Sequence, residues 1–243
     1  MKRILPILLS CLLMAACALP AFSAPRQPLV TQIRIGNTPV WGHFSPCSKK
    51  VTYYGGRPDQ YLDARALALC LNSKDTPQRN IALARNSYGL MAALSDLVAS
   101  GKIDTISTGG TDYVFHREDG RCTELEAQDD IPYFLCKLTY DKEGNVTELL
   151  DASIPTQVFY KDGKVVEINP GYESNKLIYQ NGKLSESLHY RYLYDSAGKL
   201  NYIARRDMTD DPDMVYGVRY NEDGTVQQFY FRGTLYEFQY QSI

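Results

Sequence analysis

The sequence predicts an α+β protein that is mainly β, with a small helical or α+β N-terminal region followed by an antiparallel β-hairpin repeat meander. A degenerate unit of an aromatic residue, a polar turn, Gly, a polar residue and Val or Leu recurs through the C-terminal half, and helix-forming segments are confined to residues 59–100. The 243 residues also include 19 tyrosines, a type enriched in strands. Because one hairpin is marginal alone, consecutive copies are expected to pair into an open curved or barrel-like sheet.

The repeat unit is a tight turn flanked by two short strands. In each copy a glycine follows the aromatic residue by three to five positions, and Asp or Asn precedes it in several copies. These residue types supply the positive φ that a two-residue hairpin turn needs. The copies are Phe115–Cys122, Tyr140–Val146, Tyr160–Val165, Tyr179–Leu184, Tyr194–Leu200, Tyr220–Val226 and a truncated Tyr230–Leu235.

This unit resembles YD repeats of the RHS type, and the short copies Tyr160–Val165 and Tyr179–Leu184 resemble MORN-variant repeats. The resemblance covers residues 112–243 and does not extend to residues 24–105. Such repeats are scaffolds of cell-surface proteins, toxin shells and immunity-like proteins. The resemblance therefore implies a binding or structural role, and it transfers no catalytic residue.

The chain divides into a leader at residues 1–23, an N-terminal α+β region at 24–105 and the repeat domain at 106–243. Runs of apolar and β-branched residues, bounded by Gly and Pro, predict three short strands in the N-terminal region. These strands are expected at residues 30–35, 40–44 and 51–54.

Two helices are predicted between these strands and the repeats. Strong helix formers fill residues 59–71. The second helix is expected to start at Thr76, a good N-cap followed by Pro77, and to stop at Gly101. Gly89 in its middle is expected to allow close packing against a neighbouring segment.

The first residues form an export signal. Lys2 and Arg3 supply the positive start, an apolar run follows at residues 4–16, and small residues offer a cleavage site before Ala24. The run is shorter than the about 20 residues that span a bilayer. The mature chain is therefore expected to be periplasmic or secreted.

A second interpretation of the leader stays open, because residues 14–17 resemble a bacterial lipobox. In that case Cys17 would be lipidated and the protein would be an outer-membrane lipoprotein. Membrane attachment is expected only in this case.

Cysteine usage fits an exported protein. Four cysteines remain after the leader, Cys47, Cys70, Cys122 and Cys136, and an even number outside the cytoplasm is typical of disulfides. Of the three pairings that four cysteines allow, the spacing favours Cys47–Cys70 and Cys122–Cys136. No metal site is expected, since the chain has no C-x-x-C and no His at ligand spacing.

One strand of the repeats offers a candidate binding surface. Its residues, with two arginines nearby, are Tyr190, Arg191, Tyr192, Tyr194, Arg205 and Arg206. Side chains alternate along a strand, so the three tyrosines share one face and Arg191 lies on the other. The tyrosines form either the packed face of the sheet or a recognition surface, for which Tyr and Arg are favoured.

The sequence gives little support to an enzyme. It has no G-x-S-x-G motif and only three histidines, and no cofactor is expected. An acidic loop, Asp207 to Asp213, lacks the glycine and the final Glu of an EF-hand. A hydrolase acting on cell-wall or glycan material stays as the weakest alternative, with His43 or acidic residues in a cleft between the helices and the first repeats.

The charge of the chain argues against nucleic acid as a partner. The net charge is −2 and no basic stripe is present, which disfavours nucleic acid. The favoured function is a non-enzymatic module that binds another protein, with an immunity or antitoxin-like role as its most specific form. The alternative is a lipidated structural scaffold of the envelope.

Overall fold

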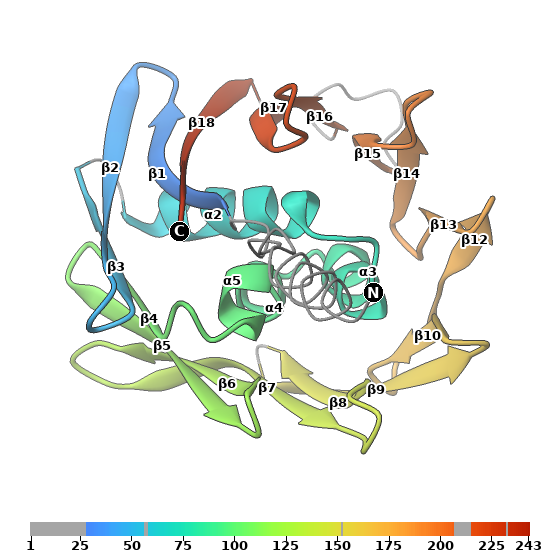
Figure 1. Ribbon diagram of the computed structural model, residues 1–243. Coiled ribbons are helices and arrows are strands. Elements are labelled where there is room, and N and C mark those ends of the chain that lie inside the picture. The colour runs from blue at the N-terminus through green and yellow to red at the C-terminus, as the bar shows by residue number, and fades with distance from the viewer. Residues whose placement is uncertain (1–27, 56–57, 152, 207–214, 232) are drawn as a thin grey trace, which may run out of the picture.

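A computed structural model of the protein describes residues 28–55, 58–151, 153–206, 215–231 and 233–243. Within them an 18-stranded sheet forms a nearly closed ring around a group of helices (Figure 1). The N-terminal strands are β1 (Pro28–Ile35), β2 (Thr38–Ser45) and β3 (Lys50–Tyr54). The helices are α2 (Pro58–Asn72), α3 (Pro77–Arg85), α4 (Tyr88–Ala93) and α5 (Asp96–Ala99).

The remaining strands follow the helices without further helical segments among the described residues. They are β4 (Thr105–Thr108), β5 (Thr111–Glu118), β6 (Arg121–Gln128), β7 (Tyr133–Tyr140), β8 (Val146–Asp151), β9 (Ile154–Lys161), β10 (Lys164–Asn169), β11 (Asn175–Lys176), β12 (Ile178–Gln180), β13 (Lys183–Glu186), β14 (Tyr190–Tyr194), β15 (Leu200–Arg205), β16 (Val215–Tyr220), β17 (Val226–Phe231) and β18 (Thr234–Ser242). The predicted mainly-β fold with a helical N-terminal region is therefore confirmed.

The sheet is almost entirely antiparallel, and most strands pair with their neighbours in the chain; β11 and β12, which follow each other directly, pair with β10 and β13 respectively. The exception to the antiparallel pairing is β3, which pairs in parallel with β4. A parallel pair needs a long connection, and here the helical segment between the two strands provides it. The ring closes where β1 pairs with β18. The three strands before the helices and the last strand of the repeats thus belong to one sheet. The shortest register among these pairings is that between β13 and β14, a single pair, Glu186 with Arg191.

The first predicted helix is confirmed as α2, but the second was wrong as one continuous helix. Thr76 caps α3 as expected, with its Oγ1 accepting from the Arg79 N–H. The helix then ends at Asn86, which is left-handed at φ 50° and ψ 39°. Asn tolerates this conformation and so ends helices, as Gly does. Ser87 starts α4, since its hydroxyl accepts from the Leu90 N–H and donates to Asp151 at 2.7 Å.

The helices fill the inside of the ring. Ile81, Leu90 and Met91 are fully buried there and pack with inward residues of the strands. The expected close approach at Gly89 is present, because a Cβ placed there would lie 3.4 Å from the Leu135 Cβ of β7. The last apolar residue of each complete repeat unit faces this interior and is buried, namely Cys122, Val146, Val165, Leu184, Leu200 and Val226.

One close contact fastens α2 to the first strands. Tyr53 of β3 donates from its hydroxyl to the Val30 carbonyl at 2.8 Å, and that hydroxyl accepts from the Arg65 Nε at 3.0 Å. The ring of Tyr53 passes over Gly42 of β2, where a Cβ would come within 2.6 Å of the Tyr53 Cε1. Gly42 is therefore required by the packing of Tyr53.

The structure explains why the repeat unit recurs in the same form along the chain. The first tyrosine of a unit donates its hydroxyl hydrogen to the backbone carbonyl of the buried last residue of the preceding unit. These repeat tyrosines and their acceptors are Tyr140 to Cys122 at 2.7 Å, Tyr160 to Val146 at 3.0 Å, Tyr179 to Val165 at 2.9 Å, Tyr194 to Leu184 at 2.9 Å and Tyr220 to Leu200 at 2.7 Å. Each bond joins two successive hairpins.

The polar position after the repeat glycine also has a structural role. Where it is a Lys or Arg, its cationic group lies 5.0 to 5.7 Å from the ring centroid of the next repeat tyrosine, as in Arg121 over Tyr140, Lys164 over Tyr179, Lys183 over Tyr194 and Lys199 over Tyr220. A cation at this distance is attracted by the ring. The turns have the expected left-handed residues, for example Asn181 at φ 51° and Gly182 at φ 82°.

Candidate functional site

The three tyrosines of the candidate surface face the inside of the ring. Tyr192 is 2% exposed and donates to the Leu83 carbonyl of α3 at 3.1 Å. Tyr190 accepts from the Asn86 side chain at 2.9 Å, and Tyr194 is a repeat tyrosine. They form the packed face of β14, which is one of the two alternatives that the sequence left open, and the exposed recognition surface does not fit these three side chains. The physical reason is that α3 occupies the interior against this strand.

Two of the three arginines of the candidate surface, Arg191 and Arg206, are separated from these tyrosines, whereas Arg205 lies on the same face as Tyr190. Arg191 and Arg206 are exposed and flank Glu186, with the Arg191 Nε 4.0 Å and the Arg206 Nη2 3.6 Å from its carboxylate oxygens. Arg205 is half-buried and pairs in register with Tyr190. The structure therefore brings Arg191 and Arg206 together around one carboxylate and separates them from the tyrosines.

The outer face of β14 to β18 carries an apolar row that the sequence interpretation missed. We call it the outer ladder. Its members lie directly opposite one another on five successive strands, and they are Leu193, Tyr202, Gly217, Tyr230 and Leu235. At a strand spacing of about 4.8 Å, such a row is about 19 Å long.

Three members of the outer ladder are strongly exposed for apolar residues in a sheet. Leu193 is 53%, Tyr202 44% and Tyr230 47% accessible to solvent. The Tyr202 ring lies beside Gly217, where a Cβ would be 3.4 Å from its Cε1. Because Gly217 has no side chain, no group projects from the sheet between Tyr202 and Tyr230 in this row. The alternation of side chains along β14 could have indicated the exposure of Leu193, because Leu193 lies two residues after Arg191 and therefore on the same face of the strand.

Arginines border the outer ladder on both sides. Arg191 lies two residues before Leu193 on β14, and Arg219 lies two residues after Gly217 on β16, both exposed on the outer face. Glu237 of β18 is engaged by Arg34 at 3.8 Å. The outer ladder is therefore an apolar surface with a positively charged side chain on each side.

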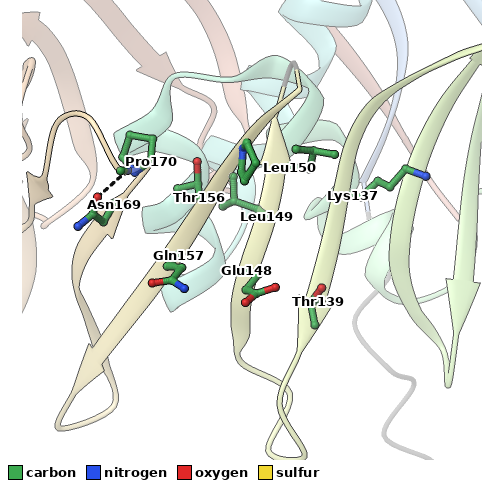
Figure 2. A pocket seen from close by; sticks show the side chains of 11 residues that line it. Lys137, Thr139, Glu148, Leu149, Leu150, Thr156, Gln157, Asn169 and Pro170 are labelled. Carbon is green, nitrogen blue, oxygen red and sulfur yellow. Dashed lines mark hydrogen bonds between the residues drawn. The ribbon is translucent and has the colours of Figure 1, made fainter.

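A second outer feature is a groove across β7 to β10, with a volume of about 420 Å³. Figure 2 shows Thr139, Glu148 and Gln157 in one row across three strands, where the register places them opposite one another. Pro155 and Pro170 add apolar surface to its lining. We call it the outer groove. Its side chains can form hydrogen bonds to a ligand.

A wider hollow of about 690 Å³ adjoins the outer groove, since Lys137 and Thr139 line both. Lys137 is already bound to Glu124 at 2.9 Å. His43, the histidine of the hydrolase hypothesis, is exposed on β2 and lines neither hollow. In the described part of the chain, no three His, Cys, Asp or Glu side chains gather as a metal site would require. Nothing in the two hollows singles out a catalytic group.

None of the four cysteines Cys47, Cys70, Cys122 and Cys136 takes part in a disulfide in the structure, so neither predicted pairing is seen there. Cys47 is exposed in the turn after β2, whereas Cys70 is buried in α2. Cys122 and Cys136 are both buried on the inner face, but Cys136 lies opposite Leu125 rather than Cys122. Burial raises the pKa of the Cys122 thiol to about 11. The two disulfides therefore stay a prediction, and spacing along the chain does not fix which positions face one another.

Several predictions fall on residues that the structure does not describe. The leader, its cleavage site and Cys17 lie before residue 28, and the acidic loop from Asp207 to Asp213 lies between β15 and β16. Over the described ranges, none of the helices combines the length and the apolar character needed to cross a membrane.

Comparison with known proteins adds no family. Neither a model of a protein family nor a curated protein matches the chain. The resemblance of residues 112–243 to YD and MORN-variant repeats therefore stays a prediction.

Proposed function

We propose that the protein is an exported, non-enzymatic module of the bacterial envelope that binds another protein through the outer ladder. The observation that carries this proposal is the outer ladder, a row of five paired positions of which three carry half-exposed apolar side chains. A contiguous exposed apolar patch on a folded protein is typical of an interaction site.

The inner face of the sheet is covered by the helices, so a partner would bind on the outer face. Inward side chains pack on α2 to α4, and the repeat tyrosines bond to carbonyl groups of neighbouring units. The outer ladder has no such packing partner among the described residues. A partner that covered it would bury two tyrosines and a leucine, and Tyr is among the residue types that contribute most to binding.

The charges next to the outer ladder define the chemistry of the partner. Arg191 and Arg219 stand on its two sides, and the nearby Glu186 and Glu237 are engaged by arginines. Charge complementarity between two surfaces favours association and selects partners. We therefore expect a protein with an apolar patch flanked by carboxylates. An immunity or antitoxin-like role, in which this module covers a functional surface of its partner, is the most specific form of the proposal.

The test is capture of partners from envelope and secreted fractions with three forms of residues 24–243. These are the wild type, the double variant Tyr202→Ser/Tyr230→Ser, and the control Tyr172→Ser. Tyr172 is 70% exposed in the loop after β10, away from the ladder. The proposal predicts one stoichiometric protein that the wild type and the control retain and the double variant loses.

The affinity of the purified pair then gives the magnitude. Loss of a single interface tyrosine that acts as a hot spot weakens binding by 2 kcal/mol or more, about 30-fold in Kd. Equal binding by the double variant and the wild type would show that the outer ladder is not the contact surface.

A further inference from the structure

A third cavity lies on the rim of the ring where the repeat turns gather. We call it the rim pocket. It is formed between the α2–α3 connection and the turns that follow β14 and β16, and its volume is about 230 Å³. This is smaller than the pockets of about 300 to 1,000 Å³ that hold drug-sized molecules. Its size suits an ion or a single charged group.

Three cationic side chains and one carboxylate line the rim pocket. They are Arg79 from the first turn of α3, Lys183 and Lys199 from two successive repeat units, and Asp75 from the connection before α3. The rings of Tyr194 and Tyr220 complete this side of the wall. The excess of positive charge in a partly enclosed space favours an anion.

Arg79 is the central feature, because its charge is buried and incompletely matched. The residue is only 8% exposed. Its Nε has no hydrogen-bond acceptor in the described part of the chain, and its Nη1 lies 3.8 Å from the Asp75 Oδ1, which is too long for a hydrogen bond. A buried guanidinium whose Nε lacks an acceptor is costly. An oxyanion beside this guanidinium would add acceptor oxygens to it.

The pKa shifts of the two rings agree with this position of the guanidinium. Burial raises the pKa of Tyr194 and of Tyr220 to about 12, and the charge of Arg79 opposes part of the rise in both. The Arg79 charge is therefore close enough to both hydroxyl groups to influence their pKa values, and all three residues line the rim pocket.

The two lysines are held at the mouth of the pocket by the repeat geometry. Each lies over the ring of the next repeat tyrosine, Lys183 at 5.0 Å from the Tyr194 centroid and Lys199 at 5.1 Å from the Tyr220 centroid. Lys183 also donates to the Gly198 carbonyl. These contacts orient the ammonium groups and leave further N–H donors on each.

Two other carboxylates near the mouth are engaged by their own turns. Asp195 accepts from the Lys199 N–H at 2.8 Å, and Asp223 accepts from the Thr225 N–H at 2.9 Å and from the Thr225 hydroxyl at 2.7 Å. The approach of Lys199 contributes to the lowered pKa of Asp223, after the hydrogen bonds from Thr225. These groups lower the positive potential at the mouth without providing an acceptor to the buried Arg79.

We infer that the rim pocket binds a small oxyanion, a phosphate or sulfate group, through Arg79 with Lys183 and Lys199. Guanidinium and ammonium groups are the usual partners of such anions, since they form short charge-assisted hydrogen bonds. The group is either a free ion or the terminal phosphate of a larger molecule that extends out of the pocket. This inference is independent of the outer ladder, which lies on another face.

The test is a titration of the mature protein with inorganic phosphate, sulfate and glycerol phosphate, each against chloride at the same ionic strength. Binding is measured by isothermal calorimetry and by the rise in Tm. The variant Lys183→Gln/Lys199→Gln removes two cations from the mouth. Its matched control is Lys164→Gln, which removes the equivalent cation over Tyr179, 5.2 Å from the ring centroid, outside the rim pocket.

The inference predicts that phosphate or sulfate binds the wild type and Lys164→Gln alike, and that the double variant binds at least tenfold more weakly. Tighter binding of glycerol phosphate than of phosphate would assign the site to a terminal group, and the reverse would assign it to the free ion. Absence of any effect beyond that of chloride would overturn the inference. Equal binding by the double variant and Lys164→Gln would overturn it as well. The variant Arg79→Lys, which keeps the charge and loses the fork of donors, is expected to weaken binding too.

Discussion

The hydroxyl groups of the repeat tyrosines are predicted to hold successive hairpins together, and Tyr220→Phe tests this at one position. The variant removes only the oxygen that donates to the Leu200 carbonyl at 2.7 Å. The ring stays, and so does the cation–π contact with Lys199. The change is therefore confined to one hydrogen bond between two repeat units.

The expected loss follows from the environment of this bond. An intramolecular hydrogen bond contributes about 1 kcal/mol, and a buried acceptor left without its donor adds to the cost. The Leu200 residue is buried, so we expect Tyr220→Phe to lower the free energy of unfolding by about 1 to 1.5 kcal/mol. For a chain of this size that corresponds to a fall in Tm of roughly 2 to 6 °C.

The assay is urea and thermal unfolding followed by circular dichroism, with Tyr202→Phe as the matched control. Tyr202 is 44% exposed on the outer face, so loss of its hydroxyl is expected to leave the free energy of unfolding within about 0.5 kcal/mol of wild type. A double variant that adds Tyr160→Phe, three repeat units away, is expected to lose about the sum of the single changes. Equal stability of Tyr220→Phe and Tyr202→Phe would refute the structural role of these hydroxyl groups.

Three further outcomes are expected. Gly42→Ala forces a Cβ to within 2.6 Å of the Tyr53 ring and should cost about 1 to 3 kcal/mol by overpacking, whereas Gly217→Ala, with its nearest contact at 3.4 Å, should cost much less in the same urea unfolding assay. Asn86→Ala should destabilise the protein more than Asn86→Gly, because both lose the bond to Tyr190 and only Ala is strained at φ 50°; thermal melts of the two variants decide this. Stability should be complete below about pH 9 and fall as the pH rises toward 12, since the unfolded chain ionises its tyrosines near 10 while burial raises the pKa of three repeat tyrosines to about 12. Unfolding free energies that stay constant between about pH 9.5 and 11.5, within the range over which the loss is expected, would contradict this.

The local rules predicted the hairpins and α2 because their signals lie within a few residues. Asn181 and Gly182 adopt the expected left-handed turn, and Thr76 caps α3 as the sequence indicates. The break at Asn86 was missed because the helical pattern continues through it. Its cause is partly non-local, since Ser87 bonds to Asp151 of β8 and Asn86 bonds to Tyr190 of β14.

The candidate surface on β14 shows what the alternation of side chains along a strand cannot predict. The pattern of β14 correctly separated Tyr192 from Arg191, but it could not say which side faces the core. That depends on the position of α3, whose Leu83 carbonyl accepts from Tyr192. Tyrosine also suits either environment, because it has an apolar body and a polar tip. The outer ladder could not be predicted as a row, since its members come from strands separated by loops of different lengths.

The same limit applies to the cysteines. The prediction placed Cys122 and Cys136 on consecutive strands, as the structure has them in β6 and β7. A register shift between Leu125 and Glu126 then sets Cys136 opposite Leu125. A shift of this kind cannot be read from spacing, although it decides which side chains meet.

Photo-crosslinking in growing cells tests the central claim most directly, which is that the outer ladder contacts another protein. A photoreactive phenylalanine analogue replaces Tyr202 in one strain and Tyr172 in another, so both positions are exposed and only the first lies on the ladder. The account predicts a single protein adduct from position 202 and none of that size from position 172. No adduct from position 202, or the same adduct from both positions, would contradict it.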